Sequence, residues 1–172
     1  FLGWTPGQVA PLLPKGLAWR LEPGTDLVVE LHLQPSGKAE SIQPSFGLFF
    51  TDDPPERTPA MLRIGSERID IPAGMKNYTV SDSYELPVDV EVQAVQPHAH
   101  YRAREIRGFA TLPDGSTRWL IYISDWDFRW QHVYRYAQPF LLPKGTRLSM
   151  QYTYDNSADN PRNPQLPPER AL

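Results

Sequence analysis

Cysteine is absent from the 172 residues of this chain. Without thiols the protein has no disulfide, no thiolate nucleophile and no Cys-ligated zinc or iron–sulfur site. Long hydrophobic runs are missing too: none approaches the ~20 residues that a membrane-spanning helix needs, so we expect no membrane span. The formal net charge is −3, without a dense Lys/Arg stripe, and this disfavours nucleic-acid binding. The composition indicates an ordinary globular protein, for which we expect neither a membrane span nor nucleic-acid binding.

Helical periodicity is the next absence. No stretch of about 12 residues repeats apolar positions at the spacing of an amphipathic helix, and 19 Pro and 11 Gly interrupt the chain. Runs rich in β-branched and aromatic residues lie between these breaks and predict eight strands. They are Asp26–Leu33, Gly47–Thr51, Tyr78–Leu86, Val88–Ala94, Glu105–Leu112, Thr117–Ser124, Val133–Ala137 and Arg147–Tyr154. We predict an all-β fold, an antiparallel β-sandwich of jelly-roll-like type.

An internal echo indicates two related units. Leu21–Leu27 and Leu142–Leu148 are each a Pro/Gly turn that leads into an alternating strand pattern. We therefore predict the last part of one sandwich domain over residues 1–55 and most of a second over residues 56–172. The tail after Asn156 has four prolines and no apolar pattern, so we expect an extended or frayed end.

Histidines are scarce, and two of the four, His98 and His100, stand two positions apart after Pro97. In a strand that continued from Val88 they would share one face and extend an inward-facing apolar row. Two imidazoles on one face form a clamp for a transition metal. The alternative is a pair of exposed or singly hydrogen-bonded histidines in a loop. Tyr101 and Arg102 are close enough in the chain to orient the pair.

The remaining candidate ligands carry weaker signals. His32 ends the alternating run Asp26–Leu33 on its more polar face, where a lone histidine is more often solvated than a ligand. We interpret His132 as structural or superficial. Met150 shares a face with Leu148 and Tyr152, and we interpret it as core filler although a thioether can bind copper.

Four segments together resemble the bacterial relatives of the copper type II, ascorbate-dependent monooxygenases, whose animal members include peptidylglycine α-hydroxylating monooxygenase and dopamine β-monooxygenase. They are Leu31–Lys38, Pro97–Tyr101, Asp125–Gln131 and Tyr154–Pro161. The resemblance implies two eight-stranded sandwich domains, each holding one copper. His98 and His100 would bind the copper that activates dioxygen, and His32 would bind the copper that passes on electrons from ascorbate. The expected substrate is a small or peptide-like molecule, and the expected location is periplasmic or secreted.

Two departures from that family stand out. No histidine precedes His32 and no methionine follows Met150, so each implied copper site lacks ligands. Either the chain is a fragment or it belongs to a branch that has lost catalysis, and the start at Phe1 favours a fragment.

Two other readings stay open. A cupin-like barrel would add Glu105 to the two histidines as a metal ligand, but Val92 and Leu148 stand where that pattern wants Gly and His. A non-catalytic β-sandwich binding module would use Trp126, Phe128 and Trp130 as an aromatic platform for carbohydrate or protein, and it predicts no metal dependence.

Overall fold

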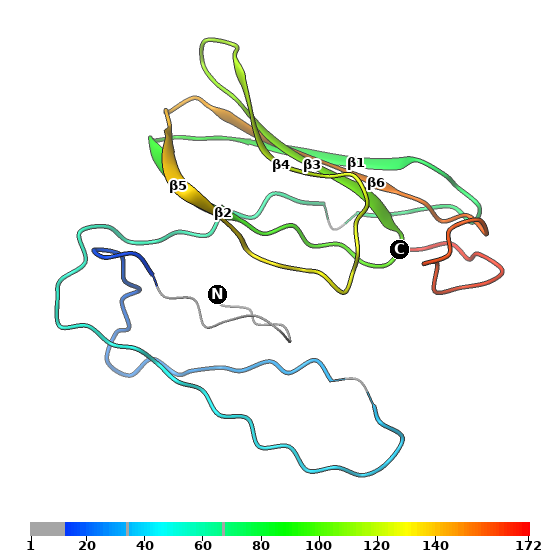
Figure 1. Ribbon diagram of the computed structural model, residues 1–172, viewed down its shortest axis with the longest axis horizontal. Coiled ribbons are helices and arrows are strands. Elements are labelled where there is room, and N and C mark those ends of the chain that lie inside the picture. Colours follow the sequence, from blue (N-terminus) through cyan, green and yellow to red (C-terminus); the bar gives the residue numbers. More distant parts are fainter. Residues whose placement is uncertain (1–12, 34, 67) are drawn as a thin grey trace. The chain divides into compact units, whose positions relative to one another are not determined.

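The computed structural model describes residues 13–33, 35–66 and 68–172. The chain divides into two units, one formed by Val9–Met61 and the other containing Leu62–Leu172. The named strands all lie in the second unit (Figure 1). They are β1 (Tyr78–Glu85), β2 (Val90–Val95), β3 (Ala103–Thr111), β4 (Thr117–Ile123), β5 (Tyr134–Leu142) and β6 (Arg147–Tyr154).

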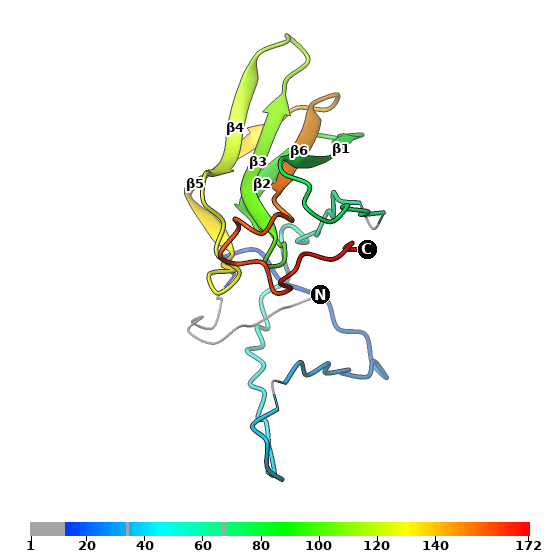
Figure 2. The same ribbon diagram turned by 90° about the vertical axis from the view of Figure 1, so that its right-hand side faces the viewer.

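Every strand pair is antiparallel. One sheet has four strands in the order β1-β6-β3-β4, which can be followed across Figure 2, and the other pairs β2 with β5. The described residues include no helix, and so none that could cross a membrane. The prediction of an all-β antiparallel fold is confirmed.

The core follows the alternation of the strands. On β3, Ile106, Gly108 and Ala110 are buried while Glu105 and Arg107 lie on the opposite face, as a period of two dictates. A first cluster of buried residues comprises Ile71, Val80, Ala99, Ala103, Ile106, Trp126 and Tyr154. A second is formed by Leu86, Ala110 and Leu142, with Val92, Leu120, Phe140 and Leu148 packed against it. Because these residues come from both sheets, the sheets share the second cluster.

Six of the eight predicted strands are confirmed, Arg147–Tyr154 with the same ends and the other five with shifted ends. The other two, Asp26–Leu33 and Gly47–Thr51, are wrong: both segments are exposed and neither belongs to a strand. A strand needs a hydrogen-bonded neighbour as well as an alternating pattern. In the described part of Val9–Met61 the chain provides only the isolated bridge between Leu17 and Arg57. Residues 1–12 of the predicted first domain lie outside the described residues.

The tail after Asn156 is anchored rather than frayed, so the frayed alternative of that expectation is wrong. The buried Asn156 amide donates hydrogen bonds to the carbonyl oxygens of Ile71, Pro72 and Glu169 at 3.2, 3.1 and 2.7 Å. The backbones of Ile71 and Ala171 pair reciprocally at 2.8 and 3.0 Å. Side-chain hydrogen bonds that join distant segments are invisible to an apolar pattern, which is why the sequence missed them.

Candidate metal site

His98 and His100 lie in an extended segment that follows β2. Pro97 and Ala99 are buried and the two histidines are exposed, so the alternation continues past the strand's end at Val95. The imidazole centroids are 5.3 Å apart with an interplanar angle of 85°. The histidines therefore share one side, as predicted. The expected core-facing row is wrong, because β2 carries an irregularity between Val92 and Ala94 and Pro97 has no N–H to extend the ladder.

Gln131 fixes the orientation of His98. Its Nε2 donates to the Phe128 carbonyl at 2.9 Å, which leaves Oε1 as the atom that faces His98 Nδ1 at 2.5 Å. A carbonyl oxygen only accepts, so Nδ1 carries the proton and Nε2 keeps its lone pair. A metal-binding histidine is usually held in this way by an acceptor behind it.

The sequence did not single out Gln131, because 33 positions separate it from His98. Tyr101 packs on the Phe128 ring at 4.2 Å, and Arg102 donates from Nε to Asn156 Oδ1 at 2.8 Å. The contact to an imidazole nitrogen therefore comes from Gln131, and the two chain neighbours have other partners.

The pKa of His100 lies below its ordinary value. Partial desolvation of the imidazole is the main cause, and the neighbouring His98 lowers the pKa further. The Phe128 ring meets the imidazole edge-on at 5.8 Å between centroids and limits its solvation. A neutral imidazole is the form that binds a metal.

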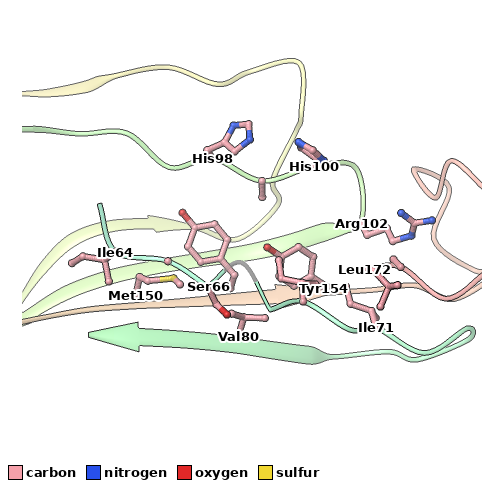
Figure 3. A pocket seen from close by; sticks show the side chains of 15 residues that line it. Ile64, Ser66, Ile71, Val80, His98, His100, Arg102, Met150, Tyr154 and Leu172 are labelled. Atoms are coloured by element: carbon pink, nitrogen blue, oxygen red, sulfur yellow. The ribbon is translucent and has the colours of Figure 1, made fainter. Parts of the chain in front are cut away.

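Both histidines stand over a cavity of about 360 Å³ (Figure 3). Its other walls are mainly apolar and include two tyrosines and a methionine of β6. They are Ile64, Gly65, Ser66, Ile69, Ile71, Val80, Ala99, Arg102, Met150, Tyr152, Tyr154, Ala171 and Leu172. Met150 packs against the first core cluster and also lines this cavity. Met150 therefore packs in the core, as the sequence analysis expected, and is also part of the cavity wall.

Burial raises the pKa of both tyrosines in this cavity. Burial raises the pKa of the Tyr154 hydroxyl to about 12, and the neighbouring Tyr152 raises it by a smaller amount. The pKa of Tyr152 is also raised by burial, and a hydrogen bond from the His98 backbone partly offsets that rise. Both hydroxyls are therefore protonated over the physiological range.

The structure does not join a third classical ligand to the pair. Among the described residues, no group of three or more His, Cys, Asp and Glu side chains could hold a metal. His32 belongs to the Val9–Met61 unit, where its exposed Nε2 contacts Glu30 Oε1 at 2.7 Å. His132 packs against Trp130 with centroids 4.2 Å apart.

Two residues of the alternative readings also have defined places. Glu105 contacts Arg107 Nε at 2.7 Å and accepts from the Tyr122 hydroxyl at 3.1 Å, and it does not line the cavity. The cupin-like set of His98, His100 and Glu105 is therefore not assembled. Trp126 is 1% exposed and belongs to the first core cluster, so an aromatic platform built on it is wrong.

In comparisons with known proteins, no family model, no curated protein and no solved structure matches the chain.

Proposed function

We propose that this chain is part of a copper-dependent, ascorbate-driven monooxygenase that hydroxylates a C–H bond of an organic substrate with dioxygen. One observation carries the proposal: two adjacent imidazoles, one held by Gln131 at Nδ1 so that its Nε2 keeps a lone pair, line a mainly apolar cavity. Copper ligands placed over a cavity that can hold an organic molecule are what oxidation of an unactivated C–H bond requires.

The described residues offer copper two nitrogen ligands that lie side by side. His98 and His100 offer neutral nitrogen donors, which suit copper in both oxidation states. Copper bound there would supply the one-electron redox chemistry that couples ascorbate oxidation to the use of dioxygen. Gln131 holds one ligand in a single tautomer, and the apolar walls exclude water from the substrate's reacting carbon.

The proposal extends to the organisation of the whole protein. Residues 1–55 would be the last part of a first copper domain and residues 56–172 most of a second. His32 would be a ligand of the electron-transferring copper. A periplasmic or secreted location, where copper and oxygen are accessible, belongs to the same proposal.

The test is a copper titration of the metal-free protein followed by electron paramagnetic resonance. We expect a type II signal with nitrogen coupling that disappears in the double variant His98→Ala/His100→Ala. His132→Ala is the matched control, because it removes an imidazole of the same unit that packs on Trp130 and not at the cavity. Copper binding that is equally strong in the parent and the double variant would overturn the proposal.

A second candidate function is a non-catalytic binding module, with its aromatic surface at a place the sequence did not indicate. Trp119 and Tyr122 of β4 are 57% and 54% exposed, with ring centroids 5.8 Å apart. Phe109 of β3 adds a third ring 5.9 Å from Trp119. Exposed aromatic clusters are typical of carbohydrate and protein contacts. Retention on an insoluble polysaccharide that Trp119→Ala abolishes, without any copper dependence, would favour this candidate.

A further inference from the structure

We propose that Arg102 is a positioning residue of the candidate metal site: it ties the loop that carries His98 and His100 to the tail, and it thereby fixes the place of His100 relative to His98. The consequence for copper rests on the proposed function. The positioning itself is a property of the metal-free chain and depends only on described residues.

The two histidines are held from different parts of the chain. The His98 imidazole contacts Gln131, and the His98 backbone N–H donates to the Tyr152 hydroxyl. The His100 imidazole meets the Phe128 ring edge-on. A ring contact of this kind fixes a direction less sharply than a hydrogen bond does. The place of His100 therefore depends mainly on the backbone that carries it.

A tight turn sets the backbone at His100. The Ala103 N–H donates to the His100 carbonyl oxygen at 3.1 Å and closes a turn directly before β3. Within this turn the Arg102 carbonyl oxygen accepts from the Asp155 N–H, directly after β6, at 2.8 Å. The backbone of the turn is thus joined to the end of β6, and the Arg102 side chain provides its second anchor.

The Arg102 guanidinium reaches the tail through two hydrogen bonds. Its Nε donates to Asn156 Oδ1 at 2.8 Å and its Nη2 to Gln165 Oε1 at 2.5 Å. Figure 3 shows the side chain leaving the loop beyond His100, with the guanidinium directed toward the tail. Hydrogen bonds from a charged donor are stronger than those between neutral groups. Two of them on one planar group also fix its orientation.

Both acceptors of Arg102 are themselves held in place. The Asn156 side chain is buried, and its Nδ2 donates to three backbone carbonyl oxygens. The Gln165 Nε2 donates to Glu169 Oε2 at 3.0 Å, which leaves Oε1 as the atom that faces the guanidinium. Because its partners are fixed, Arg102 holds the histidine loop at a set place against the tail.

The experiment compares Arg102→Gln with Arg104→Gln in the metal-free protein, by NMR with isotope-labelled histidine rings. The imidazole centroids of His98 and His100 are 5.3 Å apart, so the parent should show a nuclear Overhauser effect between the two rings. We expect Arg102→Gln to abolish that signal and to leave the contact between His98 and Gln131 intact. A variant that was merely less stable would keep the signal in its folded molecules.

Arg104→Gln is the matched control. It removes the same group two positions along the chain, where Arg104 Nη1 contacts Asp155 Oδ2 at 3.4 Å, and Arg104 is not among the described residues that line the cavity. We expect the signal between the two imidazoles to be unchanged in this variant. Gln165→Ala removes one acceptor on the tail without altering the loop, so it should weaken the signal even if Arg102→Gln does not fold.

Copper is added in the second part of the experiment. We expect Arg102→Gln to bind copper about tenfold more weakly than the parent, with nitrogen coupling from one imidazole in place of two. Arg102→Lys should lie between them, because an ammonium group cannot reproduce the two forked hydrogen bonds of the guanidinium.

Four results would overturn the inference. They are a parent without the signal between the imidazoles, an Arg102→Gln variant that keeps it, an equal loss in Arg104→Gln, and a copper affinity that Arg102→Gln leaves unchanged. Failure of the proposed function is a separate result. If the parent binds no copper at the two histidines, the monooxygenase proposal is wrong, and the measurements on the metal-free protein still decide whether Arg102 positions His100.

Discussion

The two halves of the internal echo begin alike and end differently. In Leu21–Leu27 and Leu142–Leu148 the turn is closed by the same kind of hydrogen bond, Thr25 N to Glu22 O and Thr146 N to Pro143 O, each at 3.1 Å. The glycine at the same place, Gly24 or Gly145, has a φ of 82° or 83°, which favours glycine in both turns. The backbone that follows, however, forms β6 in the second half and no strand in the first.

The difference lies in the neighbours. β6 runs between β1 and β3 and pairs with both. The segment Asp26–Leu33 has the same alternating apolar pattern, but its side chains are exposed. The described part of Val9–Met61 exposes many other large apolar side chains as well. They include Leu21, Leu27, Val28, Val29, Leu31, Leu33, Ile42, Phe46, Leu48, Phe49, Phe50 and Met61. A local turn therefore forms from local sequence, whereas a strand forms only where a partner strand completes its hydrogen bonds.

The largest expected effect of this contrast is on backbone hydrogen exchange. β3 and β6 are the two central strands of the four-stranded sheet, and each pairs with a strand on both sides. Their amides should therefore exchange only on global unfolding. Amides of Asp26–Leu33 should exchange at nearly the rate of an unfolded chain. We expect protection to differ by about a thousandfold or more, as measured by mass spectrometry at peptide resolution. Equal protection in both segments would show that Asp26–Leu33 is paired after all.

Side-chain truncation should show the same contrast in stability. Trp126 is 1% exposed in the first core cluster, so Trp126→Ala should lower the free energy of unfolding by about 3–5 kcal/mol. Phe49 is 80% exposed in the other unit, and Phe49→Ala should change it by no more than about 0.5 kcal/mol. Urea unfolding followed by circular dichroism measures both. A loss in Phe49→Ala comparable with that in Trp126→Ala would contradict the described exposure.

The same contrast explains how much of the fold sequence reasoning could predict. Each strand of Leu62–Leu172 was predicted from its own alternating residues. The prediction was right there because each of these segments has a partner strand to pair with. Asp26–Leu33 carries an equally good pattern, and nothing in it reveals that a partner is missing. An alternating pattern shows that a segment is able to form a strand, whereas the pairing of that strand depends on residues elsewhere in the chain.

The candidate site shows a similar limit. The spacing of His98 and His100 was enough to predict that they share one side. Gln131 contacts His98 only because the segment after β4 folds back beside the histidine loop, and Asn156 anchors a tail that its prolines made look loose. Contacts made by polar side chains across 33 positions or more leave no periodic trace in sequence.

High pH should weaken the unit that contains the cavity, because every tyrosine of the chain lies between residues 78 and 154. Tyr154 has a pKa of about 12 in the folded state against 10.0 for an ordinary tyrosine. Between these values the unfolded chain releases a proton that the folded chain keeps, so stability falls as the pH rises from about 10 to about 12. The contribution of Tyr154 to this loss is about 2–3 kcal/mol. The fall in the urea midpoint between pH 8 and pH 11.5 should be smaller in Tyr154→Phe than in the parent, with the remainder due to Tyr152 and Tyr136, whose pKa values burial also raises; an unchanged pH dependence would rule out this role.

The smallest expected effect is on copper affinity, and it compares His98, whose imidazole is held by a half-buried neighbour, with His32, whose neighbour is exposed. Behind His98 stands Gln131, whose amide is itself held by the Phe128 carbonyl, whereas His32 contacts Glu30 in a pair that is more than 80% exposed on both sides. An exposed pair holds an imidazole weakly, because solvent competes for both partners. Gln131→Ala should therefore weaken copper binding about tenfold, while Glu30→Ala should leave it unchanged. Gln131→Glu provides the complementary test: the carboxylate keeps an acceptor behind His98 but loses the donor to the Phe128 carbonyl, so the copper affinity should fall between those of Gln131→Ala and the parent. If Gln131→Ala and Glu30→Ala had equal effects, the imidazole of His98 would owe its orientation to the backbone alone.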